Sequence, residues 1–381
     1  MFLTFISHFI KKIFNFFLSS KFNQEIIIYL LFISTHFLFS RLLFHGVIVV
    51  AYIIALYAIN KNLTKSLWIV LLSTVLFNLG RYFPHKYSTP FSGDLVESYK
   101  VFGVSFTDII LLILLYWIKR SHETIRASFS RIDILVFIIF FFSILSATLS
   151  PHQNIAWFNL WQLIKLIIFF YLSRILFWKP GYKKITTILP LIYLSLNSIL
   201  MIMQKLKGGL IGLLVENYLS KYGNYAQDAP ALFRPGGMSW DANYSASFLS
   251  LGVIFLVHLV ISKSKMFNKR MMLIMISLFS VAIIISASRG SWLVTVFSIG
   301  IIILNAFVQK KIFLKQYLKL KIIVPIILIT LIPSSFIIER LQQFSSKMGQ
   351  STINTRLVHL KLGYTLARNY QFGVGPDVFR Y

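Results

Sequence analysis

The chain has 381 residues, of which 57% are hydrophobic and only 13% are charged, and its mean hydropathy is +0.75. In soluble globular proteins about a quarter of all residues are charged, so this composition excludes a soluble globular domain. The net charge of +27 comes largely from lysines in short loops between apolar runs. That distribution indicates contact with lipid headgroups and excludes a nucleic-acid-binding protein.

The apolar runs are long enough to cross a bilayer, which takes about 20 residues of α-helix. Their recurrence along the whole length predicts an all-α fold, a polytopic bundle of transmembrane helices with outward-facing loops. We expect about eleven spans, at Ile26–Ser40, Leu43–Ile59, Leu67–Gly80, Val104–Ile118, Ile132–Leu149, Ile155–Phe177, Ile185–Met203, Tyr244–Ile261, Met271–Ala287, Trp292–Val308 and Ile322–Ile338.

Three regions are expected along the chain. Residues 1–25 form a cytoplasmic N-terminal segment, whose Phe, Ile and Lys content favours an interfacial amphipathic helix, with a short first span as the alternative. Residues 26–338 form one multi-span membrane domain, and residues 339–381 begin a large outward loop.

The distribution of basic residues predicts the orientation. Lysines and arginines cluster in alternate short loops, at residues 11–21, 61–65, 119–131, 179–184, 263–270 and 310–321. This bias marks those loops and the N-terminus as cytoplasmic. Arg234, Arg289 and Arg356 fall on the opposite side. Arginines at the outer ends of spans suggest an anionic ligand, such as the diphosphate of a lipid.

The first outward cluster, Phe233–Asn243, immediately precedes a span. Its proline and two glycines, Gly236 and Gly237, predict a turn that lets main chain approach a ligand closely. Arg234 offers a planar fork to phosphate or carboxylate oxygens. The alternative is an interfacial anchor, in which Trp240 lies in the aromatic belt and Arg234 meets headgroups.

The second cluster, Ser286–Trp292, joins two apolar runs with almost no loop. Arg289 and Gly290 stand at its centre, where a cation is costly in hydrocarbon unless it is paired. The alternative is an arginine that snorkels from a helix end to the surface.

The third cluster begins at Arg356 and ends with a turn that contains Gly373 and Gly375. The stretch between them predicts an amphipathic helix on the outer leaflet, because apolar residues recur on one face. These residues are Leu357, Leu360, Tyr364 and Ala367. His359 is a weaker candidate for a general base.

Two cations fall inside an apolar run. Lys165 is expected to contact a lipid phosphate or to pair with Asp108 or Asp133, and Arg174 to snorkel to the cytoplasmic surface. The scattered carboxylates and the absence of cysteine predict no metal site.

In this order, the three clusters resemble the O-antigen ligase and O-antigen polymerase family of bacterial inner-membrane proteins. The resemblance covers mainly Phe233–Tyr381 and is carried by Arg234–Gly237 before a span, Ser288–Gly290 between two spans, and Phe372–Phe379 in a late outward loop. It implies a multi-pass glycosyltransferase of the inner membrane with its active face in the periplasm, and neither metal nor cofactor.

The resemblance implies transfer of a glycan from an undecaprenyl-diphosphate donor to a lipid or glycan acceptor, either the lipid A core or another lipid-linked glycan. Arg234, Arg289 and, by a looser match, Arg356 are implied to bind the donor diphosphate. We expect the remaining site residues to contact or shape the substrate site; they are Gly236, Gly237, Trp240, Gly290, Gly373 and Gly375.

The family carries a histidine shortly after the glycine turn, followed by one or more spans. Here the sequence stops at Tyr381 and His359 precedes the turn, so we expect a chain that is cut short in its periplasmic loop, with the general base beyond Tyr381. A transporter or flippase for a lipid-linked or anionic substrate, with Lys165 at its site, is the alternative function. A structural membrane scaffold is the third possible function.

Overall fold

The structure is a computed structural model that describes residues 21–38, 42–76, 106–120, 130–151, 153–179, 181–211, 233–238, 242–262, 264, 266–308 and 347–373. Across these ranges the secondary structure is helical and contains no strand, which confirms the all-α prediction for that part of the chain. The chain divides into two compact units. Unit 1 comprises Met1–Ile59 and Thr187–Arg340, and unit 2 comprises Asn60–Thr186 and Leu341–Tyr381.

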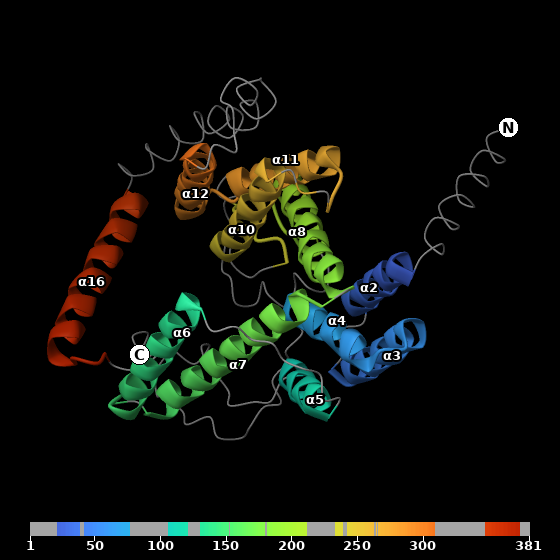
Figure 1. Ribbon diagram of the computed structural model, residues 1–381. Coiled ribbons are helices and arrows are strands. Elements are labelled where there is room, and N and C mark those ends of the chain that lie inside the picture. The colour runs from blue at the N-terminus through green and yellow to red at the C-terminus, as the bar shows by residue number, and fades with distance from the viewer. Residues whose placement is uncertain are drawn as a thin grey trace. The chain divides into compact units, whose positions relative to one another are not determined.

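Nearly every predicted span coincides with a helix (Figure 1). Unit 1 holds α2 (Lys21–Leu38), α3 (Leu42–Asn60), α8 (Tyr182–Lys207, from Thr187 onward), α10 (Ala242–Ile261), α11 (Lys269–Ile285) and α12 (Arg289–Val308). Unit 2 holds α4 (Leu63–Leu76), α5 (Phe106–Arg120), α6 (Arg131–Thr148), α7 (Gln153–Phe177) and α16 (Lys347–Asn369). The predicted span Ile322–Ile338 and the N-terminal segment before Lys21 lie outside the described residues.

Among the described residues, five helical stretches are long and apolar enough to cross a membrane, and they indicate a membrane protein. They are Arg131–Thr148, Asn159–Phe177, Tyr182–Lys207, Ala242–Ile261 and Arg289–Ala306. Shorter apolar helices occupy Asn23–Phe32, Ile48–Asn60 and Leu63–Val75. The expected count of about eleven spans is therefore not confirmed, since a 14-residue helix such as α4 is about 21 Å long and falls short of the hydrocarbon core of about 30 Å.

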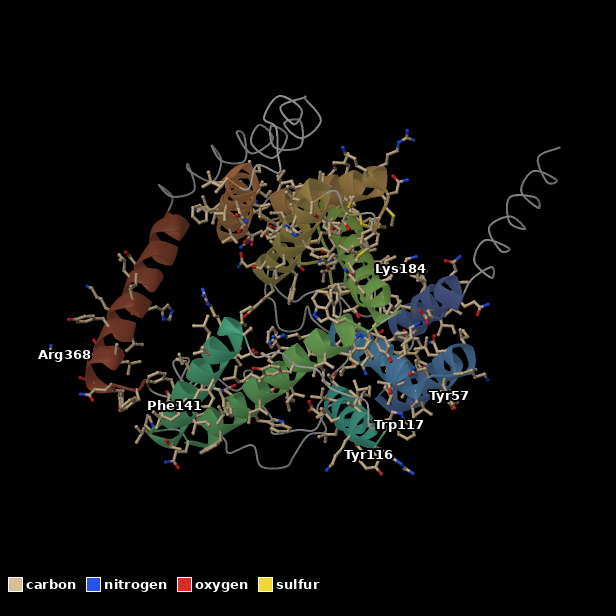
Figure 2. The ribbon with its side chains drawn as sticks, in the orientation of Figure 1. Tyr57, Tyr116, Trp117, Phe141, Lys184 and Arg368 are labelled. Carbon is tan, nitrogen blue, oxygen red and sulfur yellow. The ribbon has the colours of Figure 1, made fainter. Side chains whose placement is uncertain are left out.

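Helix α6 shows the surface that a bilayer requires. Its only buried side chains are Asp133 and Ala147, while Phe137 is 66% exposed. Exposed aromatic side chains occur on α5 as well as on α6, and Figure 2 labels Tyr116 of α5 and Phe141 of α6. Soluble proteins rarely expose so much contiguous apolar surface, so lipid is the medium that fits this face.

In unit 1, α10 packs beside both α11 and α12 (Figure 1). Gly252 of α10 allows the closest approach. A Cβ atom at that position would lie 2.6 Å from Leu194 Cδ1 of α8 and 3.1 Å from the ring of Phe279 in α11. Small residues at such crossings let transmembrane helices make dense van der Waals contact.

In unit 2, two ion pairs connect α7 to its neighbours. Lys165 Nζ lies 2.9 Å from Asp108 Oδ1 of α5, which confirms one of the two predicted pairings. Arg174 Nη1 lies 2.7 Å from Asp133 Oδ1 of α6. Arg174 was expected to extend to the cytoplasmic surface, and instead its guanidinium binds a carboxylate within the protein. The partner is Asp133, because the first turn of α6 lies against the last turn of α7.

Substitution of Gly252 tests the α8–α10–α11 crossing. We expect Gly252→Val to lower the free energy of unfolding by about 1–3 kcal/mol, because the side chain overpacks against Leu194 and Phe279. Gly300→Val in α12 is the matched control, since a Cβ there meets nothing within 4 Å. The measurement is the thermal unfolding midpoint in detergent micelles; equal shifts for the two variants would contradict the packing.

The Lys165–Asp108 pair is tested by removing one partner and then both. Lys165→Leu leaves the buried Asp108 carboxylate without its ammonium group, and we expect a loss of about 3–5 kcal/mol in unfolding free energy. The double variant Lys165→Leu with Asp108→Leu should recover most of that loss. Chemical denaturation in mixed micelles measures both, and a double variant no more stable than the single one would argue against the pair.

Candidate functional site

The turn between α11 and α12 holds Arg289 in a defined place. Helix α11 ends at Ile285, and Ala287 adopts a left-handed conformation with φ +53°. Such a conformation costs an alanine about 1–2 kcal/mol, so other contacts must hold the turn. Ser286 Oγ accepts a hydrogen bond from the Ser288 N–H at 3.2 Å. Arg289 then begins α12.

The side chain of Arg234 reaches this turn from a distant part of the sequence. Its Nε donates to the Ser286 carbonyl oxygen at 2.9 Å across a separation of 52 residues, and its Nη2 donates to Asn243 Oδ1 at 2.7 Å. These two bonds fix the plane of the guanidinium before any ligand arrives. The first two arginine clusters of the sequence are therefore joined at one end of unit 1.

Two amide side chains of α8 hold the glycine turn that follows Arg234. Gln204 pairs with both main-chain groups of Gly237: the Gly237 N–H donates to Oε1 at 2.8 Å, and Nε2 donates to the Gly237 carbonyl at 3.2 Å. Asn197 Oδ1 accepts from the Met238 N–H at 2.7 Å. This amide clamp, formed by Asn197 and Gln204, satisfies main-chain groups that no helix satisfies.

Gly237 is required by this close approach. Its φ is +62°, and a Cβ atom would lie 2.2 Å from Asn197 Oδ1. Ser245 of α10 adds to the contact, because its Oγ donates to the Gly236 carbonyl and accepts from Asn197 Nδ2 at 3.2 Å. The two glycines thus lie against α8 and α10. Their predicted contact with a substrate stays a prediction.

The main chain just before Arg234 is also anchored to α8. Lys205 Nζ donates to the Phe233 carbonyl oxygen at 3.3 Å, which brings a further cation to the segment that carries Arg234. Nearby, hydroxyl groups join α10 to α12: Ser291 Oγ lies 3.0 Å from Ser288 Oγ and 3.3 Å from Ser247 Oγ. Ser288 and Ser291 are buried, so their hydroxyl groups hold this end of the unit together, and the cationic side chains are the donors that phosphate oxygens accept from.

The two arginines stand at opposite ends of helix dipoles. Arg234 binds the carbonyl of Ser286, the residue that caps the C-terminus of α11, where a cation is favoured. Arg289 is the first residue of α12, where the dipole disfavours a cation by about 0.3–1 kcal/mol. Gly290 beside it is exposed and has open space around its Cα. An anion at this position would relieve the repulsion.

The remaining predicted site residues lie in unit 2 or outside the described ranges. Arg356 is in α16, although its side chain is not described, and Trp240 and Gly375 lie outside the described residues. Gly373 follows α16 with φ +79°, and a Cβ there would lie 3.2 Å from Ser146 Oγ of α6. His359 is exposed on α16.

The sequence interpretation missed the supporting residues on α8. Asn197 and Gln204 are spaced by seven in an apolar helix and so lie on one face. Polar side chains at such spacing in a span indicate a partner inside the protein, and this signal would have found them. Asn243 carried no such signal, because its partner is set by tertiary structure.

No known protein family, curated protein or solved structure matches the chain. The resemblance to O-antigen ligases and polymerases therefore rests on the residues quoted above. Within the described ranges, no group of three or more His, Asp or Glu residues could hold a metal ion. Metal-independent chemistry stays a prediction.

Replacing Gly237 tests the amide clamp. Gly237→Ala should displace the Asn197 amide and strain the left-handed turn, with an expected loss of about 1–3 kcal/mol in unfolding free energy. Gly290 also lies at this end of unit 1, but a Cβ atom there would meet nothing within 4 Å. Gly290→Ala should therefore leave stability unchanged or slightly higher. Thermal unfolding in detergent compares the two, and a Gly237→Ala protein as stable as Gly290→Ala would rule the clamp out.

Proposed function

We propose that the chain is a membrane glycosyltransferase of the O-antigen ligase or polymerase type. In this proposal, Arg234 and Arg289 bind the diphosphate of an undecaprenyl-diphosphate-linked glycan at one end of unit 1, on the periplasmic face. The acceptor is a lipid or another lipid-linked glycan, and the membrane is the bacterial inner membrane.

The observation that carries the proposal is the hydrogen bond from Arg234 to the Ser286 carbonyl. It ties two arginine-bearing segments together and orients one guanidinium in advance. Donors that are oriented before binding stabilise developing charge without reorganisation at the moment of reaction. The placement of Arg289 at a helix start, where a cation is disfavoured, adds a second reason to expect an anion.

The surface below Arg289 supports a ligand with a lipid tail. Leu293 and Phe297 follow Arg289 at intervals of four residues, so all three share one face of α12. Leu293 is 73% exposed and Phe297 72% exposed. A cation above an exposed apolar strip matches an anionic headgroup attached to a long hydrocarbon chain, as in a polyprenyl diphosphate.

The chemistry follows from these positions. An acceptor hydroxyl oxygen attacks the anomeric carbon of the donor, and the bond from that carbon to the diphosphate oxygen breaks. Its electron pair remains on the diphosphate, where guanidinium groups stabilise the added charge. The hydroxyl proton passes to a general base. In this scheme, the two arginines take the place that a divalent metal ion has in many other transferases.

The rival function, a transporter or flippase, depends on Lys165. The structure pairs Lys165 of α7 with the buried carboxylate of Asp108 in α5, so the lysine has a structural role as the partner of that carboxylate. No contact in the described residues favours transport over this structural role, and we do not put it forward.

The proposal predicts that Arg289→Ala lowers glycan transfer by about 100- to 1000-fold, because one donor to the diphosphate is lost. Thermal stability should stay unchanged or rise, since the cation leaves a helix start. Transfer of a fluorescent oligosaccharide from undecaprenyl diphosphate to candidate acceptors measures the first effect. Native mass spectrometry compares the binding of undecaprenyl diphosphate with that of undecaprenol, which lacks the anion.

Arg270→Ala is the matched control, because Arg270 lies in the first turn of α11, at the far end from the Ser286 turn. It should leave transfer and binding unchanged. Arg234→Ala should lower both transfer and stability, since the Ser286 carbonyl loses its partner. Full transfer by Arg289→Ala protein, or equal affinity of the native chain for undecaprenol and its diphosphate, would reject the proposal.

A further inference from the structure

The described part of helix α16 has no buried side chain, and an apolar strip runs along one of its exposed faces. Leu357, Leu360 and Tyr364 recur at intervals of three and four residues, so they share one face of the helix. Leu360 is 70% exposed and Tyr364 is 73% exposed. An exposed strip of this kind marks a surface that meets either a lipid or another protein.

The charges of α16 favour lipid. The helix spans 23 residues and contains no Asp or Glu, while Lys361 and Arg368 lie beside the strip and are exposed. Figure 2 shows Arg368 projecting from the helix. The apolar stems of lysine and arginine can lie along a membrane surface while their cationic ends reach phosphate groups. Pairing with α16 of a second copy would bring like charges together.

The turn after α16 lies level with the end of a span. Gly373 closes this turn, and its N–H donates to the Tyr370 carbonyl at 2.9 Å. A Cβ atom on Gly373 would lie 3.2 Å from Ser146 Oγ, in the last turn of α6. In a bilayer that α6 crosses, the end of this helix would mark the boundary between hydrocarbon and headgroups. The contact with Ser146 would then hold the C-terminal end of α16 at that boundary.

We propose that α16 lies on the bilayer surface and binds anionic lipid headgroups through Lys361 and Arg368. The strip of Leu357, Leu360 and Tyr364 inserts among the upper parts of the acyl chains. This is the binding mode of interfacial amphipathic helices, in which burial of the apolar face and attraction to acidic lipids act together. This proposal concerns residues of unit 2, whereas Arg234 and Arg289 belong to unit 1, and it does not depend on the proposed transferase function.

The absence of cysteine from the sequence allows a direct test with the full chain. Single variants Leu360→Cys and Leu362→Cys, the second on the opposite face, are labelled with an environment-sensitive dye. The protein is reconstituted into nanodiscs of phosphatidylcholine alone or with phosphatidylglycerol. We expect the dye at position 360, and not at 362, to shift to shorter wavelength and to be quenched by lipid-attached quenchers, most strongly in the anionic discs.

Charge removal separates lipid binding from simple exposure. Lys361→Gln with Arg368→Gln should weaken the response of the dye at position 360 to phosphatidylglycerol by roughly tenfold or more. Lys269→Gln with Arg270→Gln, which removes two charges at the start of α11, should leave it unchanged. Equal signals at 360 and 362, equal insertion in both lipid mixtures, or protection of position 360 only when two chains share a disc would each overturn the proposal.

Discussion

The carbonyl of Ser286 is the point on which the candidate site depends. It lies at the C-terminus of α11, where main-chain oxygens have no partner within the helix, and in a membrane protein such groups must find one. Arg234 supplies that partner through its Nε. The same contact that completes the end of a helix therefore ties the Arg234 guanidinium to the turn that leads into α12. Under the proposed function, stability and ligand binding are coupled in this one side chain.

That contact requires the loop carrying Arg234 to be held in turn. The main chain around Gly237 is not helical, so its polar groups must be satisfied by side chains where water is scarce. Gln204 and Asn197 do this from α8, and Ser245 does it from α10. Gly237 in this loop lies so close to Asn197 that only glycine fits at its position. The loop is thus held by neutral amides and hydroxyls, which bring no negative charge to this end of the unit.

Sequence reasoning succeeded where the length of an apolar run alone decides the structure, as it does for a helix that crosses a membrane. Apolar length predicted helices such as α6 and α10 within a few residues. The choice of Arg234 and Arg289 as site residues, made from charge among glycines, stays a prediction. It failed where the answer depends on how helices meet. Arg174 looked like a snorkelling cation because Asp133 is distant in sequence, yet the α6–α7 hairpin brings them together. The bond between Arg234 and Ser286 was invisible for the same reason.

The position of Arg289 bears most directly on function. Interactions that only build the fold would favour an acidic or neutral residue at the start of α12, as they favour Arg234 at the end of α11. Residues that contradict a local preference are concentrated at functional sites. The face below Arg289 is apolar and exposed at Leu293 and Phe297, as the lipid-facing side of a span is expected to be. A lipid tail can lie along such a face while its headgroup meets Arg289, and this is our reason for proposing a lipid-linked diphosphate rather than a soluble anion at this end of unit 1.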